Sequence, residues 1–550
     1  MKAYRALAAA IAAERTEVVF GVLGDGNMHV VSELVEVHGV RFVAARHEQA
    51  AVAMADGYSR STGRPGVCTV THGPGLTQTG TPLTAARLAR SPVVLVAGDT
   101  ALAARHHGQN IDQQTFALAT AGAFQPARLP RTLAEDVQLA FRHVRLGRGP
   151  IVLNVGVDLQ GADLAEGWRY VPAVAVLPPT QRLRPDPVRV ASVARLLASA
   201  RRPVVLAGWG AVASDAREPL VRLADRVGAV LTVTLRAKGW FAGHPFDLGL
   251  AGGFSSELTR AVLQEADCVV AFGASLNGFT VDRGRLFPRA QVVHVDVEPD
   301  RIGHFSPVQE AVLGDARATA EALLDALPAS PSDPGGDYRT PQLAARLAAW
   351  RPFAGVEFVT DPEGADPREV ALVCDEWLPR DRVVVVGIGH FTGYPAIHVG
   401  VEHPRDLILP WHLGAVGQAL PVAVGVAAGR ASGTVVAFEG DGGLMMSLAE
   451  LETAARCRIP LLIVVLDDGG YGAEFHLMAK QGLPTRLALF DNPDLVAVAR
   501  SLGLQAFEAR TAGALRAILA DLGPLREPTL VRVRVSRRVV NDEIFRALTG

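Results

Sequence analysis

Short runs rich in valine, isoleucine and leucine alternate with longer Ala- and Leu-rich stretches along the chain, and glycine or proline commonly separates them. This alternation is typical of parallel sheets whose strands are joined through helices. We therefore predict an α/β protein with ligands at the carboxyl ends of its strands. The predicted strands are Val18–Val22, Arg41–Ala45, Gly66–Thr71, Pro92–Ala97, Pro150–Asn154, Pro203–Ala207, Ala229–Thr234, Cys268–Phe272, Gln291–Val297, Val383–Val386, Thr434–Phe438, Leu461–Leu466 and Thr529–Val533.

Two segments of turn-forming composition interrupt this alternation and predict domain boundaries. They are the proline-rich Leu177–Pro187 and the Pro- and Gly-rich Pro328–Pro341. A chain of 550 residues is long enough for three or four domains. We therefore predict three doubly wound domains with parallel sheets, at residues 1–175, 188–328 and 342–550.

Charge and composition narrow the classes of partner. Lysine plus arginine number 54 and aspartate plus glutamate 56, without a long run of like charge, so we expect no nucleic-acid partner. No apolar run is long enough to cross a bilayer, and Lys2–Ala13 predicts an amphipathic helix rather than a signal peptide. The four cysteines lie far apart and fit a reducing compartment. These features predict a cytoplasmic protein that acts on small molecules.

The segment 434–472 carries the densest group of motifs. One strand run ends in Gly440-Asp441-Gly442-Gly443, a helical stretch follows through Leu451 and Ala455, and a second strand run ends in Asp467-Asp468-Gly469-Gly470. A right-handed crossover makes the two strands parallel, so Asp441 and Asp468 should emerge at one edge of the sheet. Two carboxylates, a backbone carbonyl and diphosphate oxygens would suit Mg²⁺, and glycines before a helix suit a diphosphate. Each motif alone is also a common turn or helix cap, but the pair in this context favours the site.

These motifs make the chain resemble the thiamine diphosphate enzymes of the acetolactate synthase, benzoylformate decarboxylase and benzaldehyde lyase type, whose signature is Gly-Asp-Gly followed after a spacer by Asn-Asn. The family's order of pyrimidine-binding, middle and diphosphate-binding domains matches the three predicted domains. The resemblance implies thiamine diphosphate and Mg²⁺, with Asp441, Asp468 and the main-chain oxygen of Gly470 as metal ligands. This chain departs from the signature in having Asp467-Asp468, which adds a negative charge beside the diphosphate.

A second motif, Arg46 to Ala51, lies between a predicted strand and a predicted helix. By resemblance, Glu48 is the family's catalytic glutamate, whose carboxyl bonds N1′ of the aminopyrimidine and promotes loss of the C2 proton. Without the diphosphate motif, Glu48 would be interpreted as a first-turn residue favoured by the helix dipole.

Other segments resemble the family's cofactor loops. Gly389, His390 and Phe391 correspond to a diphosphate-contacting turn, although a plain strand-end loop is an equal alternative. Val416 takes the place of the apolar residue that props the cofactor into a bent shape, and it could equally belong to the core. The predicted cofactor-binding residues are Glu48, Gly389, His390, Phe391, Val416, Gly440, Asp441, Gly442, Gly443, Asp468, Gly470 and Tyr471.

Two loops of the first domain supply the remaining catalytic candidates. Thr71 to Gly75 resembles a Ser/Thr-Gly-Pro-Gly loop near the reacting carbon, which predicts His72 as a proton relay. The segment His106 to Gln113 falls where relatives place an active-site glutamine; spacing leaves Gln109 and Gln113 open, and we name Gln109. We assign no metal to the paired histidines, because adjacent loop residues rarely converge on one ion.

The resemblance implies a decarboxylase or carboligase, in which the cofactor ylid adds to a 2-oxo acid, CO₂ leaves, and protonation or ligation follows. Acetolactate synthases carry Arg-Phe-Asp-Asp in the middle domain and a tryptophan after Asn-Asn, and the stretches 273–278 and 472–476 have neither. Loss of the guanidinium removes a bidentate partner for an acceptor carboxylate, so we favour 2-oxo acids as donors and aldehydes as acceptors. The alternatives are a lyase or ligase of hydroxy ketones or 2-hydroxyacyl-CoA, and a non-catalytic scaffold, which has no use for Glu48.

The resemblance also raises the questions of a nucleotide site in the middle domain and of the oligomeric state. Some relatives hold FAD or ADP in the middle domain, and Gly208, Gly210 and Leu276–Asn277 could line such a site. Strand-end glycines need no ligand, so we do not favour a nucleotide there. Family members form each active site between two chains, which implies a homodimer or homotetramer.

Overall fold

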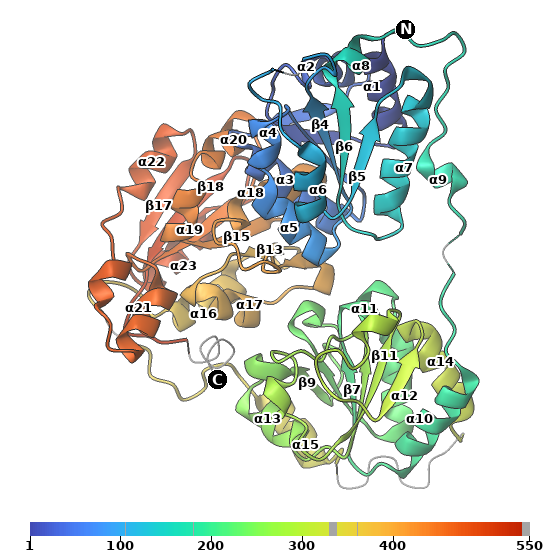
Figure 1. The fold of residues 1–550 in the computed structure, drawn as a ribbon. Coiled ribbons are helices and arrows are strands. Elements are labelled where there is room, and N and C mark those ends of the chain that lie inside the picture. The colour runs from blue at the N-terminus through green and yellow to red at the C-terminus, as the bar shows by residue number, and fades with distance from the viewer. Residues whose placement is uncertain (105, 180, 329–337, 360, 542–550) are drawn as a thin grey trace. The chain divides into compact units, whose positions relative to one another are not determined.

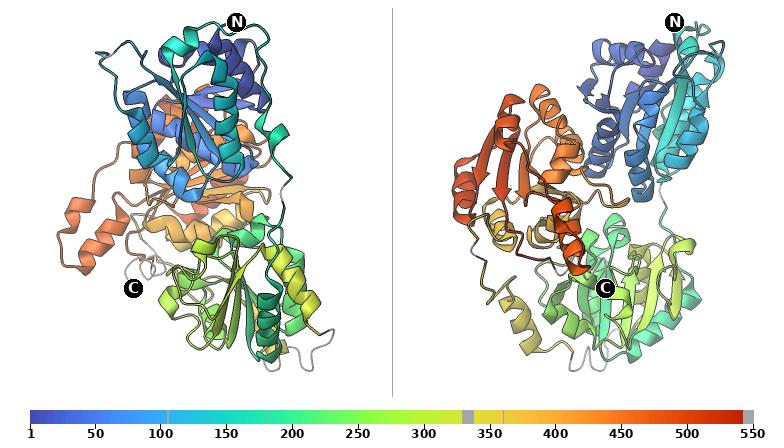
Figure 2. Two further views of the ribbon diagram at one scale, coloured as in Figure 1. Left: turned by 45° about the vertical axis from the view of Figure 1, so that its right-hand side comes forward. Right: turned by 60° about the vertical axis from the view of Figure 1, so that its left-hand side comes forward.

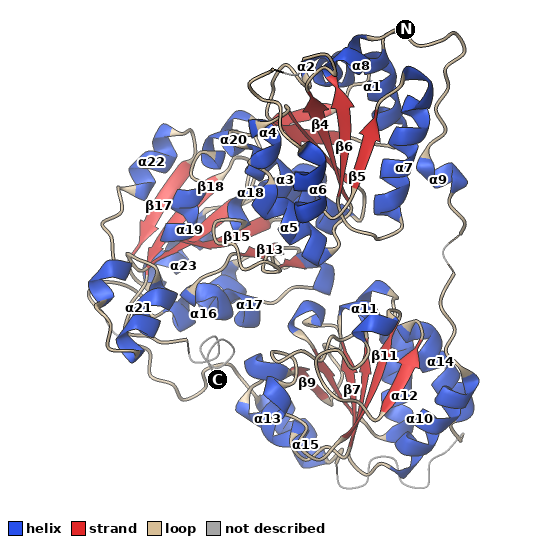
Figure 3. Cartoon of the chain, in the orientation of Figure 1, coloured by secondary structure: helices blue, strands red, loops and turns tan. Residues whose placement is uncertain are grey.

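The computed structural model describes residues 1–104, 106–179, 181–328, 338–359 and 361–541. Three six-stranded parallel sheets follow one another along the chain, and helices cover them (Figure 1, Figure 3). This arrangement confirms the predicted α/β class. Within the described residues, no helix is long and apolar enough to cross a membrane.

The first sheet has the strand order β2-β1-β3-β4-β6-β5. Its strands are β1 (Val18–Gly21), β2 (Arg41–Ala44), β3 (Gly66–Val70), β4 (Val93–Asp99), β5 (Phe124–Ala127) and β6 (Ile151–Gly156). The helices of this part are α1 (Ala3–Ala13), α2 (Met28–Glu36), α3 (Glu48–Thr62), α4 (Pro74–Thr77), α5 (Gly80–Ala89), α6 (Gln113–Thr120), η1 (Pro130–Thr132), α7 (Leu133–Arg145), α8 (Val157–Gly161) and α9 (Ala173–Val176).

The second sheet has the order β12-β11-β10-β7-β8-β9. Its strands are β7 (Pro203–Ala207), β8 (Val230–Val233), β9 (Asp247–Leu250), β10 (Cys268–Phe272), β11 (Gln291–Asp296) and β12 (Glu310–Leu313). The helices of this part are α10 (Pro187–Ser199), α11 (Trp209–Ala213), α12 (Arg217–Val227), η2 (Leu235–Ala237), η3 (Gly252–Phe254), α13 (Glu257–Leu263), η4 (Asp282–Gly284), η5 (Pro299–Arg301), α14 (Ala316–Ala326) and α15 (Pro341–Ala349).

The third sheet has the order β14-β13-β15-β16-β18-β17. Its strands are β13 (Val383–Val386), β14 (Leu407–Ile408), β15 (Val435–Gly440), β16 (Leu462–Asp467), β17 (Gln505–Ala509) and β18 (Thr529–Arg534). The helices of this stretch of the chain are α16 (Pro367–Trp377), η6 (His390–Thr392), α17 (Gly393–His398), η7 (Pro404–Asp406), α18 (Ala419–Gly429), α19 (Asp441–Met446), α20 (Glu450–Arg456), α21 (Gly472–Lys480), η8 (Thr485–Ala488), α22 (Leu495–Ser501) and α23 (Ala512–Asp521), of which α17 and η7 belong to the second of the two compact units described below. The single helix predicted after Gly443 is in fact two, α19 and α20, separated at residues 447–449.

All thirteen predicted strands are present, and the five strands that the sequence did not predict lie at sheet edges. These five are β5, β9, β12, β14 and β17. The middle strands β3, β10 and β13 are buried along their whole length, whereas β5, β9 and β12 are mostly half-buried or exposed. An edge strand is covered less completely than a central one, so it lacks the continuous apolar run from which buried strands are recognised.

The chain forms two compact units, and the first contains both the first and the third sheet. It consists of Met1–Pro178, Val359–Thr392 and Ile408–Val539, while Pro179–Phe358 and Gly393–Leu407 belong to the second. Helices α3 and α18 pack against each other within the first unit (Figure 1, Figure 2). A Cβ atom on Gly57 of α3 would overlap the carbonyl of Val422, and one on Gly425 of α18 would overlap that of Met54. Glycine at these two positions therefore lets the helix backbones touch.

Candidate functional site

Four turns converge where strands β13, β15 and β16 end. A Cβ atom on Gly440 would lie 3.1 Å from the ring of Phe391, and one on Gly417 would lie 2.9 Å from the carbonyl oxygen of Gly443. A Cβ atom on Gly472 would overlap the carboxylate of Asp468 and lie 3.1 Å from Cβ of His390. The structure therefore brings together the turns that hold the predicted cofactor-binding residues of this part of the chain.

The two candidate metal ligands with side-chain carboxyls, Asp441 and Asp468, both have raised pKa values. Burial, together with the nearby Asp467, raises the pKa of Asp441 to about 6. Burial and the charge of Asp441 raise the pKa of Asp468 to about 7. Asn492 donates a hydrogen bond of 2.6 Å to Oδ2 of Asp441 and so fixes that carboxylate. Two neighbouring carboxylates are the hard oxygen donors that Mg²⁺ prefers, so they fit the implied metal, and Gly470 follows Asp468 two residues later in the sequence.

Asp467, the first of the two residues that depart from the Asn-Asn signature, has its own partners. Its side chain is fully buried, and Oδ2 lies 2.6 Å from Nε of Arg532 and 3.3 Å from Nη1 of Arg534. The backbone N–H of Gly469 donates to its other oxygen over 3.0 Å. The two guanidinium groups offset the negative charge of Asp467, so Asp467 adds less to the charge around Asp441 and Asp468 than an unpaired aspartate would.

The remaining cofactor-binding candidates of the third sheet differ in environment. His390 is buried, and burial together with His476 lowers its pKa to about 3, so its imidazole is neutral. The ring centroids of these two histidines are 4.4 Å apart. The Tyr471 ring lies against Gly442 and, at 5.1 Å between centroids, against Phe490. Val416 is half-buried and not part of the fully buried core.

Glu48 is the first residue of α3 and is half-buried. His47 caps the helix, since its Nδ1 accepts a hydrogen bond of 3.2 Å from the N–H of Gln49. In the described part of the chain, the Glu48 carboxyl has no hydrogen bond or ion pair with a protein group. That carboxyl is therefore available to a ligand.

His72 belongs to a cluster with Asp25, which the sequence analysis did not name, and with His107, one of the paired loop histidines. One possible ligand atom from each of the three lies within 4.8 Å of the others. Nε2 of His72 is buried, has no hydrogen-bond partner among the described residues and lies 3.8 Å from Oδ2 of Asp25. Nδ1 of His107 accepts the N–H of Gln109 over 3.2 Å, so a neutral His107 carries its proton on Nε2. A protonated nitrogen cannot bind a metal, and the cluster suits proton transfer.

The two candidate glutamines occupy different environments. The side chain of Gln113 is buried, donates to the carbonyl of Gly98 over 3.0 Å and accepts the N–H of Gly73 over 3.4 Å. Both ends of its amide are therefore used to hold the loop before Pro74. Gln109 is half-buried, and its backbone lies directly against Gly73. Its catalytic role stays a prediction.

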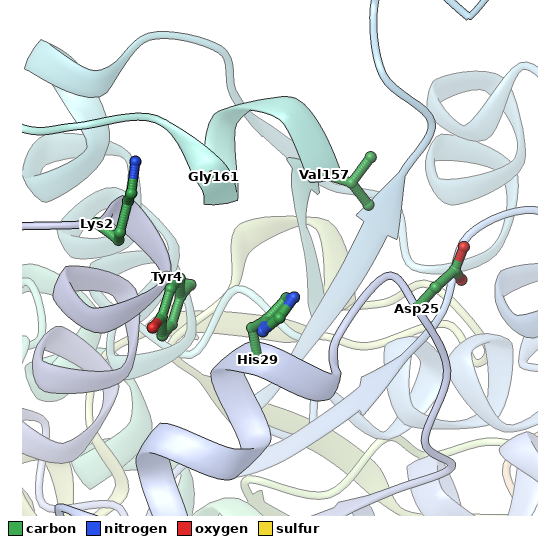
Figure 4. Close-up of a pocket in the computed structure, with 6 residues that line it drawn as sticks. All are labelled: Lys2, Tyr4, Asp25, His29, Val157 and Gly161. Atoms are coloured by element: carbon green, nitrogen blue, oxygen red, sulfur yellow. The ribbon is translucent and has the colours of Figure 1, made fainter.

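A cavity of about 380 Å³ opens beside the Gly24–Asn27 loop. The close-up in Figure 4 shows His29 and Tyr4 on one side and Asp25 on the other. The lining residues are Lys2, Tyr4, Asp25, His29, Val157 and Gly161. Because Asp25 borders both this cavity and His72, the cavity lies next to the proton-transfer cluster.

The glycines considered for a nucleotide in the second unit are explained by backbone packing. A Cβ atom on Gly208 would overlap the carbonyl of Gly273, and one on Gly210 would lie 2.7 Å from Cα of Gly273. The turn after β7 therefore needs small residues to pack against the end of β10, without any ligand.

Three family models match successive parts of the chain. Residues 1–118 match the N-terminal TPP binding domain of thiamine pyrophosphate enzymes, residues 190–323 match their central domain, and residues 387–533 match their C-terminal TPP binding domain. These matches bear out the predicted order of domain types and imply thiamine diphosphate as the cofactor.

Similar proteins carry related descriptions. The acetolactate synthase isozyme 2 large subunit of Escherichia coli is 30% identical, with 90% of this chain and 88% of that protein covered. The probable acetolactate synthase large subunit of Methanocaldococcus jannaschii is 29% identical, with 92% and 87% covered. The solved Rhodococcus jostii RHA1 thiamine diphosphate-dependent 4-hydroxybenzoylformate decarboxylase shares the fold, with a TM-score of 0.81 at 22% identity, covering 98% of this chain and 99% of that one. The chain is thus a member of the thiamine pyrophosphate enzyme family, related to acetolactate synthase large subunits.

Proposed function

We propose that this chain is a thiamine diphosphate- and Mg²⁺-dependent enzyme that decarboxylates a 2-oxo acid and joins the remaining fragment to an aldehyde. The observation that carries the cofactor assignment is the crowding of Asp441 and Asp468 where the strand-end turns converge. Buried carboxylates whose pKa values are raised by burial and by neighbouring carboxylates are stabilised when a cation lies between them.

The chain's own residues would hold the cofactor as follows. Asp441, Asp468 and the main-chain oxygen of Gly470 would bind Mg²⁺, and the Gly440–Gly443 turn would receive the diphosphate. Val416 would support the bent cofactor, and Tyr471, Gly389, His390 and Phe391 would line its diphosphate end. Neutral His390 can donate an N–H to a phosphate oxygen without adding a charge.

Thiamine diphosphate, when bound, supplies a nucleophilic carbon that adds to the carbonyl of a 2-oxo acid and accepts the electrons released when CO₂ leaves. Glu48 would exchange a proton with the aminopyrimidine N1′, since its carboxyl has no protein partner among the described residues. Asp25, His72 and His107 would move protons on the substrate side. A buried imidazole nitrogen without a partner, close to a carboxylate, is suited to that task.

We infer the class of acceptor from the residue types in α21 and in the stretch 273–278. This helix follows Tyr471 and reads GAEFHLMAK, so it has no tryptophan, and the stretch 273–278 has no arginine. An acceptor that carries a carboxylate needs a cationic partner. An aldehyde needs none, and the cavity beside Asp25 offers it space.

Product analysis distinguishes these acceptors. With saturating cofactor, pyruvate plus an aldehyde should yield a hydroxy ketone faster than pyruvate alone yields acetolactate. Benzoylformate, benzoin and a 2-hydroxyacyl-CoA, assayed beside pyruvate, separate decarboxylation from cleavage of hydroxy ketones or thioesters. Efficient acetolactate formation from pyruvate alone would show that another group replaces the missing arginine and would overturn the acceptor assignment.

We further propose that the active site forms between two copies of the chain, so that Glu48 of one copy serves the diphosphate site of the other. The smallest active unit would be a homodimer, and dimers could pair into a homotetramer. Glu48→Gln and Asp441→Ala chains should each be inactive alone, whereas their mixture should regain about a quarter of the wild-type activity through hybrid dimers with one intact site. Full activity in a monomer, measured by sedimentation at assay concentration, would contradict this proposal.

A further inference from the structure

The turn that carries Glu48 is held by a buried carboxylate from the third sheet's part of the chain. The backbone N–H groups of Arg46 and His47 both donate to Oε1 of Glu450, each over 3.2 Å. Glu450 is the first residue of α20, and only 1% of it is exposed. These two N–H groups precede α3 and have no partner within it, so Glu450 supplies the acceptor that they need.

Glu450 is itself fixed in orientation. The hydroxyl of Thr453, one turn further along α20, donates to Oε2 over 2.7 Å. The N–H of Arg46 also lies 3.4 Å from this second oxygen. Both oxygens of the Glu450 carboxylate therefore accept hydrogen bonds, and rotation of the side chain would break more than one of them.

The side chains around this contact form a second, more exposed layer. Nε of Arg46 lies 2.6 Å from Oε2 of Glu452, and Arg456 donates to the carbonyl of Ala44 over 2.6 Å. These contacts dock α20 onto the end of β2 but do not touch the N–H groups next to Glu48. On α20, Glu452 and Arg456 therefore attach the helix to β2 and its following turn, whereas Glu450 fixes the N–H groups before Glu48.

We propose that Glu450 is a positioning residue, which holds the backbone before Glu48 so that the Glu48 carboxyl reaches its proton-transfer position. The inference rests on the role proposed above for Glu48. Proton transfer depends steeply on distance, and a misplacement of about 1 Å can slow a reaction by roughly a hundredfold. Glu450 also lies in the connection between Asp441 and Asp468, so the segment that joins the two candidate metal ligands directly holds the Glu48 turn.

Four variants separate positioning from docking. Glu450→Ala removes the acceptor, Glu450→Gln keeps an amide oxygen for both N–H groups, and Thr453→Val removes the hydroxyl that orients Glu450. Glu452→Ala is the matched control: Glu452 lies on α20 like Glu450, but its removal breaks the ion pair with the Arg46 side chain and leaves the acceptor of the two N–H groups in place. Each full-length protein is examined for backbone amide exchange without cofactor, for thiamine diphosphate affinity by calorimetry, and for deuterium exchange at C2 of the bound cofactor.

In Glu450→Ala we expect faster amide exchange at Arg46 and His47, cofactor affinity within about twofold of wild type, and C2 exchange slowed about tenfold or more. Glu450→Gln should restore most of the C2 exchange rate, and Thr453→Val should lie between the two. Glu452→Ala should behave as wild type in all three measurements.

Wild-type C2 exchange in Glu450→Ala, or an equal loss in Glu452→Ala, would overturn the inference. If Glu450→Ala does not fold, Thr453→Val decides, and unchanged amide and C2 exchange in that variant would overturn it. Glu48→Gln is measured in parallel, because wild-type C2 exchange in that protein would mean that the proposed role of Glu48 has failed rather than the positioning by Glu450.

Discussion

Glu48→Gln should slow deuterium exchange at C2 of bound thiamine diphosphate by about a hundredfold or more. The amide is nearly the same size as the carboxyl but cannot pass a proton to N1′. Cofactor affinity, measured by calorimetry, should change little, because the Mg²⁺ and diphosphate ligands are elsewhere in the chain. Exchange at the wild-type rate would remove Glu48 from the mechanism.

A suitable control for this experiment is Glu33→Gln, which alters a glutamate on α2 of the same sheet. Glu33 is half-buried and lies 3.7 Å from Arg5. It has no role in the proposed site, so its C2 exchange rate should equal that of the wild type. A loss in both variants would indicate a general disturbance of the first sheet's helices.

Removing the metal ligands should have an equally large effect on cofactor binding. Asp441→Ala, or treatment of the wild type with EDTA, should weaken thiamine diphosphate binding by roughly a hundredfold, because the two carboxylates and the diphosphate share one ion. Asp491→Ala, an exposed aspartate beside Asn492, should bind as the wild type does. Calorimetric affinities that are unaffected by EDTA and by Asp441→Ala would refute the metal bridge.

The pH dependence of this binding follows from the raised pKa values of Asp441 and Asp468, about 6 and about 7. Because these values lie above those of an unfolded chain, the two groups make the metal-free protein less stable as pH rises through this range. Metal binding requires both carboxylates to be ionised and relieves their repulsion. The increase in melting temperature caused by Mg²⁺ and thiamine diphosphate should therefore be larger at about pH 8 than at about pH 5.5.

The centres of the three sheets could be predicted from sequence because buried parallel strands are continuous apolar runs. β17 shows why the edges could not: its sequence is QAFEA, and its first residue is exposed. The same limit applied to α19 and α20, which read as one helical stretch although the chain bends at residues 447–449. The local sequence pattern reflects burial and the helix or strand propensity of each residue. The position of a sheet edge or of a break in a helix depends on neighbours that are distant in sequence.

At the candidate site, the sequence could predict which residues lie close together wherever chain topology alone decides proximity. Asp441 and Asp468 follow neighbouring strands of one βαβ unit, so the fold had to place them at one edge. Asn492 and Glu450 were missed because nothing in their local sequence indicates which distant group they contact. Arg532 and Arg534 did leave a signal: they alternate on β18, which pairs with β16 directly beside Asp467. Residues two apart share a face of a strand, so two arginines there indicate a buried acidic partner.

The close contact of α3 with α18 limits how this enzyme can be altered. Gly57 and Gly425 stand where each backbone meets the carbonyl of the other helix, so even alanine would push the helices apart. α3 also begins with Glu48, and a shift of that helix would be transmitted to its first residue. The residues that line the cavity lie outside α3 and α18, and under the proposed function those other than Asp25 are the positions to randomise when new acceptors are sought. Chimeras that exchange the first or last domain with a relative should keep a glycine at both helix positions in the same register.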